Sequence, residues 1–310
     1  MSNLKDIKNR INTVKSTQKI TKAMKMVAAS KVKKAENTVK ASRPFTKELN
    51  LMFKKLLNSV DSYSNQTLRI SSAVDNYPEL LKIREVKNVG LIVITSNKGL
   101  AGAYNSNIIK SVLKKVDEYD KSGIKVYLFI IGQKGYSALL KKLKNYNAEI
   151  VKTYFNVADV PVPENVNFLT EDIAEYYVSK KIDKIEIITT RFKNMMSYSV
   201  EEWEVLPIKD LNSDYERHHD DVLEPLMEFL PDMHNVLQKI VPMYITNIIF
   251  QSLLEANASE LASRMTAMSS ASNNAEKMLN ELSVQYNKTR QFTITQEIIE
   301  VVSGANAQVN

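Results

Sequence analysis

The chain has 310 residues, of which 44% are hydrophobic and 25% are charged, and it contains no cysteine. This composition is ordinary for a globular protein, and the lack of cysteine excludes disulfides, thiolate metal sites and thiol chemistry. The net charge of +7 is uneven, because residues 1–58 carry +12 and the remainder carries −5. A basic segment beside an acidic body predicts an acidic partner: a nucleic acid, an anionic membrane or an acidic protein surface.

The N-terminal segment predicts one long helix, because its first 43 residues contain neither proline nor glycine. Its apolar residues recur at spacings of three and four, the period of a two-helix coiled coil, at Leu4, Ile7, Ile11 and Val14. After a shift in phase, we expect this seam to continue through Ile20, Met24, Val27 and Ala28. The segment has no apolar signal core, so we expect no targeting peptide.

The middle of the chain alternates apolar β-branched runs with amphipathic patterns, which is typical of a parallel sheet covered by helices. Strands are predicted over Val89–Thr95, Ile124–Ile131, Ile150–Phe155, Ile182–Thr189 and Val200–Leu206. Helices are predicted over Asn105–Asp120, Gly135–Lys144 and Asn167–Lys180. The polar stretch Asn58–Asn76 is interpreted as a linker, and Lys209–Glu224 as a charged loop.

The C-terminal segment predicts a second long helix, because 61 residues between Pro242 and Gly304 contain no proline or glycine. Three prolines, Pro225, Pro231 and Pro242, are expected to mark the approach to it. Its heptad seam is Leu254, Ala258, Leu261, Met265, Met268, Ser272, Ala275, Leu279, Leu282 and Tyr286. The uncharged stretch Ile240–Leu254 is shorter than the roughly 18 residues of a membrane span, so none is predicted.

These elements predict an α/β protein in which the two termini form a long antiparallel coiled coil beside a central Rossmann-like domain with a mostly parallel sheet. We expect the N-terminal helix in residues 1–58, the central domain in 70–210 and the C-terminal helix in 225–310. Around the seam, residues 265–275 carry no charge, whereas a solvated helix face normally carries Lys and Glu. This stretch therefore indicates enclosure by other protein.

Signals for catalysis are few. The turn Lys98–Gly102 follows the first strand and opens a helix, a place where phosphates bind in α/β sheets, but a tight strand-to-helix turn that needs glycine is the favoured explanation. His218 and His219 precede two aspartates, yet adjacent loop residues seldom converge on one metal ion, and a solvated loop explains them. A nucleotide-binding enzyme and a basic nucleic-acid binder remain alternatives, although no aromatic residue interleaves with the lysines before Phe45.

Both ends of the chain carry long, specific motifs. The N-terminal motif is TQKITKAMKMVAASK, residues 17–31. The C-terminal motifs include RMTAM at 264–268, YNKTRQ at 286–291 and ITQE at 294–297, and the central turn has TSNKGL at 95–100. These motifs resemble those of the gamma subunit of the rotary ATP synthase, and the resemblance covers essentially the whole chain. Phe292 departs from the family's usual small residue, and the polar tail 306–310 runs past its usual end.

The resemblance implies a central rotating stalk of a proton-translocating ATP synthase, with no catalytic site, cofactor or metal of its own. Its implied partners are three alpha and three beta subunits around the coiled coil, an epsilon subunit and the membrane c-ring, with no nucleic acid and no direct nucleotide binding. Carried over by motif, Arg290, Gln291 and Thr295 would form a catch against the beta subunit, and Met24 and Lys25 would contact the beta-subunit lever. The implied location is the cytoplasmic side of a bacterial inner membrane, as a peripheral protein, with the mitochondrial matrix side as the alternative.

Overall fold

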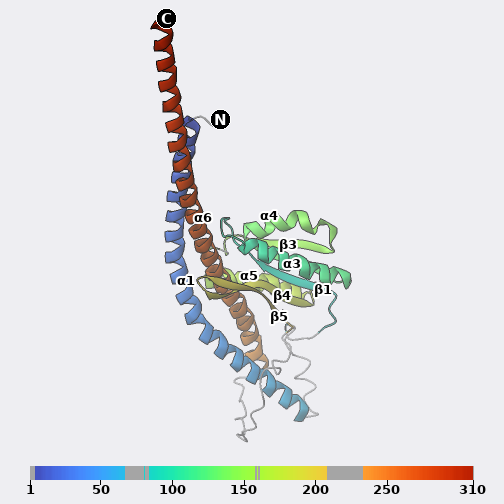
Figure 1. Cartoon of the computed structure of the whole chain (residues 1–310). Helices are drawn as coiled ribbons and strands as arrows, with labels where there is room; N and C mark the ends of the chain where they lie inside the picture. The colour runs from blue at the N-terminus through green and yellow to red at the C-terminus, as the bar shows by residue number, and fades with distance from the viewer. Residues whose placement is uncertain are drawn as a thin grey trace. The chain divides into compact units, whose positions relative to one another are not determined.

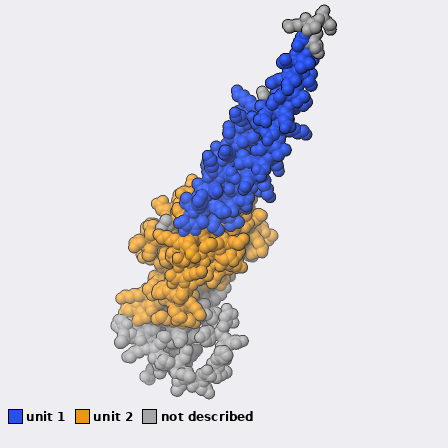
Figure 2. Space-filling model, turned by 60° about the vertical axis from the view of Figure 1, so that its left-hand side comes forward, with its two compact units in different colours: residues 1–30, 264–310 blue, residues 31–263 orange. Residues whose placement is uncertain are grey.

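The computed structural model describes residues 4–66, 80, 84–157, 159, 161–207 and 233–309. The chain divides into two compact units, shown in blue and orange in Figure 2. Unit 1 comprises residues 1–30 and 264–310, and unit 2 comprises residues 31–263. Two long helices, α1 (Leu4–Gln66) and α6 (Met233–Val309), each contribute residues to both units.

Unit 2 contains a five-stranded sheet with the order β3-β2-β1-β4-β5. The strands are β1 (Asn88–Ile94), β2 (Lys125–Ile131), β3 (Ala148–Tyr154), β4 (Lys184–Asn194) and β5 (Ser197–Leu206). The first four strands are parallel, and β5 pairs antiparallel with β4 at the edge. This order and direction confirm the Rossmann-like, mostly parallel sheet.

Helices cover both faces of the sheet (Figure 1). The connections carry α3 (Tyr104–Lys121), α4 (Gln133–Lys142) with the 3-10 turn η2 (Leu143–Asn145), and α5 (Pro163–Val178). One face packs against α3 and α4, through β1 residues such as Leu91 and Val93. The other face packs against α5 and against parts of both terminal helices.

The terminal helices are therefore part of the sheet's own core in unit 2. Phe53 of α1 stacks on Tyr244 of α6 with ring centroids 4.2 Å apart and an interplanar angle of 12°. The same cluster buries α6 residues at helical spacing, namely Leu237, Val241, Tyr244, Ile245, Ile249, Leu253 and Ala256. This burial accounts for the apolar stretch 240–254. Within the described part of the chain, no helix is long and apolar enough to cross a membrane.

The structure corrects two expectations about where the terminal helices end. Helix α6 begins at Met233 and runs through Pro242, so this proline does not mark an approach to the helix. Similarly, α1 runs through Pro44 and reaches Gln66, so the first nine residues of the predicted linker 58–76 are helical. A helix proline removes one backbone hydrogen bond, and the burial of apolar neighbours such as Val241 offsets that loss. Residues 67–76 and 209–224 lie outside the described part.

The turn between β2 and α4 depends on a glycine. Gly132 has φ of +98°, and a Cβ built there would lie 2.2 Å from the Thr95 carbonyl oxygen. The Thr95 hydroxyl donates to the Ile131 carbonyl (3.0 Å) and accepts from the backbone N–H of Gly135 (2.9 Å). Thr95 follows directly after the last residue of β1, so this contact fixes where the end of β1 meets the start of α4.

We predict that Gly132→Ala destabilises unit 2 by about 3 kcal/mol or more, because both the backbone angle and the space exclude a methyl group. The matched control is Gly123→Ala, where φ is +71° but no atom lies within 4 Å. The control should lose about 1–2 kcal/mol, from backbone strain alone. Urea unfolding followed by the fluorescence of Trp203, the chain's single tryptophan, measures both. Equal losses of stability in the two variants would show that the close approach of Gly132 to the Thr95 carbonyl is unimportant.

Candidate interaction surfaces on the terminal helices

In unit 1 the two helices run antiparallel, side by side, with both chain termini at the same end (Figure 1). The predicted α6 seam is confirmed here, since its residues are buried or half-buried: Met265, Met268, Ser272, Ala275, Leu279, Leu282 and Tyr286. Leu and Met at heptad spacing need such a partner, because burying each contributes roughly 1.5–3 kcal/mol. This seam is what holds the helix pair together.

The α1 side of the seam differs from the prediction. Ile20 and Val27, expected in the seam, are 60% and 57% exposed. The buried or half-buried positions are instead Gln18, Thr21, Met24 and Ala28, so the expected Met24 and Ala28 are confirmed and Gln18 and Thr21 take the place of Ile20 and Val27. The Thr21 hydroxyl donates to the Gln18 carbonyl of its own helix (3.0 Å), so its burial leaves no unpaired donor. The prediction followed apolar residue type and therefore missed the two polar positions of the seam.

The misassigned residues create an exposed apolar patch on α1. Ile20, Val27 and Met26, which is 59% exposed, lie outside the seam. Lys25 between them is exposed, whereas Met24 is half-buried against the helix pair. The two residues of the proposed lever contact therefore differ, because Lys25 is available to a partner and Met24 largely supports the seam.

The same segment of α1 presents unneutralised positive charge. Six basic side chains are exposed, and within the described residues none of them takes part in an ion pair: Lys8, Arg10, Lys15, Lys19, Lys22 and Lys25. Like charges along one helix repel each other. An acidic partner would relieve that repulsion, so the charge pattern selects for such a surface.

The motif residues near the end of α6 are also exposed. Gln291 and Thr295 lie one helical turn apart on the same face, with Arg290 beside them. The Thr295 hydroxyl donates to the Gln291 carbonyl at 2.9 Å, so it is tied to its own backbone. In the part of the chain that the structure describes, the side chains of Arg290 and Gln291 form no hydrogen bond or ion pair. Their polar groups are free to bind another chain.

Beyond Thr293, every described side chain of α6 up to Ala305 is exposed. This run contains five large apolar side chains, Ile294, Ile298, Ile299, Val301 and Val302, each at least 45% exposed. Phe292, just before it, is 56% exposed. Apolar groups on this scale mark an interaction site rather than a solvated helix. The end of α6 is therefore built to be enclosed.

Two other sequence candidates yield no site in the described residues. At the Lys98–Gly102 turn, the Ser96 hydroxyl donates to the Lys98 carbonyl (2.7 Å), and the Asn105 side-chain oxygen accepts from the Ser96 N–H (3.1 Å). The turn is thus held by the chain's own polar groups. His218 and His219 lie outside the described residues, and no group of three metal-ligating side chains occurs within them.

Comparison with known proteins identifies the family. The ATP synthase family model matches residues 3–308. The ATP synthase gamma chain of Synechococcus sp. strain JA-3-3Ab is 36% identical and that of Chloroherpeton thalassium 36%; each alignment covers 99% of this chain, with 100% and 98% of the respective relative. The chain belongs to the ATP synthase gamma-chain family. As a gamma chain, it is a non-catalytic subunit with a central-stalk role in a rotary ATP synthase.

Solved structures agree with this assignment. A chain in the central stalk and c-ring structure of the Tetrahymena thermophila mitochondrial ATP synthase is 25% identical, with a TM-score of 0.57 over 82% of this gamma chain and 99% of that chain. A chain of the Euglena gracilis mitochondrial ATP synthase has a TM-score of 0.64 over 98% of this chain and 94% of that one. The latter is 15% identical, so it supports the fold alone.

We predict that Leu282→Ala, in the buried seam of unit 1, destabilises the helix pair by about 2–5 kcal/mol, because it leaves a cavity between the helices. The control is Val284→Ala on the same helix, which is 70% exposed and should change stability by no more than about 0.5 kcal/mol. Thermal unfolding followed by circular dichroism at the helical minimum measures both. Equal effects of the two substitutions would mean that the seam is assigned to the wrong face.

Proposed function

We propose that unit 1 of this gamma chain turns inside a ring of three alpha and three beta subunits and passes rotation to the catalytic sites. The exposed apolar end of α6 is the observation that carries this proposal, since residues 294–305 have no covering in the described chain. A rotating shaft needs smooth contacts without strong directional anchors. Aliphatic side chains and the uncharged stretch 265–275 supply such a surface.

Arg290, Gln291 and Thr295 form the polar catch of this shaft. Free Arg290 can use its planar fork of donors to bind a carboxylate in two places at once. Gln291 supplies both a donor and an acceptor on an adjacent face. These groups lie near the start of the exposed run 294–305, whose large apolar side chains are aliphatic. They therefore supply the directional contact that makes one rotary position differ from another.

Lys25 contributes the second contact, against an acidic lever of the beta subunit, and Met24 positions it by anchoring α1 in the seam. The row of six unpaired basic side chains supports this role, since it attracts a negatively charged partner over a long stretch of helix. Attraction of this kind is weakened by salt and therefore acts mainly in steering and alignment.

The sheet of unit 2 serves as the foot, beside an epsilon subunit and the membrane c-ring. The relative from Tetrahymena thermophila, whose structure comprises central stalk and c-ring, supports that placement. We assign residues 70–210 to the foot, between the N-terminal helix α1 and the C-terminal helix α6, whose bounds replace the expected 1–58 and 225–310. The bacterial sources of the relatives favour the cytoplasmic side of an inner membrane.

Reconstitution with alpha and beta subunits tests the proposal. We expect the chain to co-elute with them as one complex and to raise ATP hydrolysis above that of the alpha and beta mixture. The isolated gamma chain should hydrolyse no ATP. Separate elution with unchanged hydrolysis would contradict the proposed function.

We predict that the double variant Arg290→Ala/Gln291→Ala assembles but loses roughly tenfold or more in ATP synthesis, because two charged or polar contacts to the beta subunit disappear. Synthesis is measured in vesicles carrying the whole enzyme, per assembled complex. Lys277→Ala is the control, because it removes one exposed positive charge from α6 away from the motif. Wild-type synthesis by the double variant would exclude the catch.

A further inference from the structure

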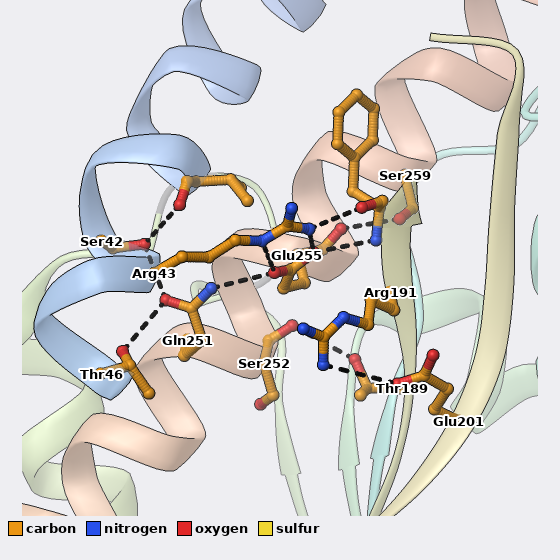
Figure 3. Close-up of polar contacts among 12 residues, drawn as sticks. Ser42, Arg43, Thr46, Thr189, Arg191, Glu201, Gln251, Ser252, Glu255 and Ser259 are labelled. Carbon is orange, nitrogen blue, oxygen red and sulfur yellow. Dashed lines mark hydrogen bonds and ion pairs between the residues drawn. The ribbon is translucent and has the colours of Figure 1, made fainter. Parts of the chain in front are cut away.

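A buried ion pair joins the two terminal helices within unit 2 (Figure 3). Arg43 of α1 donates from Nε to Glu255 Oε1 (2.7 Å) and from Nη2 to Glu255 Oε2 (2.8 Å), a bidentate contact. The Glu255 side chain on α6 is 1% exposed, whereas that of Arg43 is 35% exposed. The hydrogen bond to Glu255 raises the pKa of the Arg43 guanidinium above its ordinary value. The guanidinium of Arg43 is therefore positively charged at any physiological pH.

The same two side chains also form hydrogen bonds with the sheet. Arg43 Nη2 donates to the Phe192 carbonyl of β4 (2.6 Å), and the Phe192 N–H donates to Glu255 Oε2 (2.9 Å). Arg43, Glu255 and the Phe192 peptide thus form a closed ring of hydrogen bonds across α1, α6 and β4. Phe192 is itself 2% exposed and the Glu255 side chain 1%, so the carboxylate side of the ring is shielded from water, where such bonds are strong.

A shell of polar side chains fixes the ring in place. Gln251 Nε2 donates to Glu255 Oε1 (3.0 Å), and its own oxygen accepts from the hydroxyl of Ser42 (2.7 Å) on α1. Figure 3 shows these residues converging from the two helices on Glu255. Every oxygen of the Glu255 carboxylate therefore has two donors, which leaves it little freedom to move.

Helix α6 has other polar attachments to the sheet domain, whereas among the α1 side chains that the structure describes, which end at Phe53, Arg43 makes this connection. The Thr189 hydroxyl donates to the Ser252 carbonyl (3.2 Å), that of Tyr104 to the Ala256 carbonyl (3.2 Å), and that of Ser263 to the Ala101 carbonyl (2.7 Å). The apolar contacts of α1, such as Phe53, hold it on the sheet domain through the hydrophobic effect, which is non-directional. The hydrogen bonds of Arg43 are directional and fix the position of α1 on the sheet domain.

We propose that Arg43 is a positioning residue for energy coupling: with Glu255 it locks α1, α6 and β4 into one rigid joint, so that torque on the sheet domain reaches both helices together. This inference rests on the stalk role given above. Both helices continue from unit 2 into unit 1, so a displacement of α1 against α6 at this joint changes the torque that the helix pair transmits.

The joint needs arginine specifically. Three partners surround Arg43, namely two carboxylate oxygens and one carbonyl, and the guanidinium fork satisfies all three in one plane. A lysine keeps the positive charge but concentrates its donors on a single nitrogen, so it cannot span the carboxylate and the carbonyl in the same geometry. Arg43→Lys therefore preserves the charge and removes the lock.

The test uses the whole enzyme in sealed vesicles, with Arg43→Lys beside Arg191→Lys. Arg191 lies on β4 next to Phe192 and forms an ion pair with Glu201 at 4.0 Å. Half of its side chain is exposed, so it is the matched control. The readout is the ratio of ATP-driven proton pumping to ATP hydrolysis per assembled complex. We expect this ratio to fall by about threefold or more for Arg43→Lys, most steeply against a proton gradient, and to stay at the wild-type value for Arg191→Lys.

A residue that merely stabilised the fold would lower the amount of complex without changing this ratio. An unchanged ratio in Arg43→Lys overturns the proposal, and so does failure of both Arg43→Lys and the isosteric Glu255→Gln to assemble, because the pair would then serve folding. Failure of the wild-type chain to assemble with alpha and beta subunits would contradict the proposed function instead. The two ideas therefore fail in different arms of the experiment.

Discussion

The packing of the two chain termini on each other is the interaction on which the rest of the structure depends. Residues separated by more than 200 positions meet along one seam, because each helix alone exposes an apolar stripe that water disfavours. In unit 1 the seam is the core itself, with Ile7, Ala28, Met268 and Leu282 buried in it. In unit 2 the same two helices also cover one face of a parallel sheet.

The two units use different chemistry for this packing. Unit 2 adds directional polar bonds, centred on Glu255, to a large apolar cluster. Unit 1 relies on small and aliphatic seam residues, and in the described chain its six basic side chains from Lys8 to Lys25 form no ion pair and its apolar residues 294–302 are exposed. A base cross-linked by such bonds and a helix pair whose exterior can bind other chains are the properties that a central stalk needs, since one part must transmit force and the other must contact a surrounding ring.

Much of this fold can be predicted from the sequence, where a local pattern carries the information. The strands of the sheet and the α6 seam follow from apolar runs and heptad spacing, which are local. The seam of α1 was misassigned at Ile20 and Val27 because two of its true positions, Gln18 and Thr21, are polar. Pro242 was misassigned because tertiary burial around Val241 outweighs the local cost of a helix proline.

The functional residues divide in the same way. No periodicity distinguishes Arg290 or Gln291 from any other exposed residue, so their proposed role comes from motif resemblance alone. The structure adds that their side chains are free and that an apolar run follows them. The contact of Arg43 with Glu255 joins residues 212 positions apart and has no local signature, so only a folded structure reveals it.

Direct observation of rotation tests the central claim, that the sheet domain and the terminal helices turn as one body inside a surrounding ring. Since the chain has no cysteine, Lys110→Cys on the exposed side of α3 creates a unique attachment point for a bead. With the alpha and beta subunits fixed to a surface and ATP supplied, the account predicts that the bead turns in one direction and pauses at three angles per revolution. Hydrolysis of ATP while the bead only fluctuates about a fixed angle would contradict it.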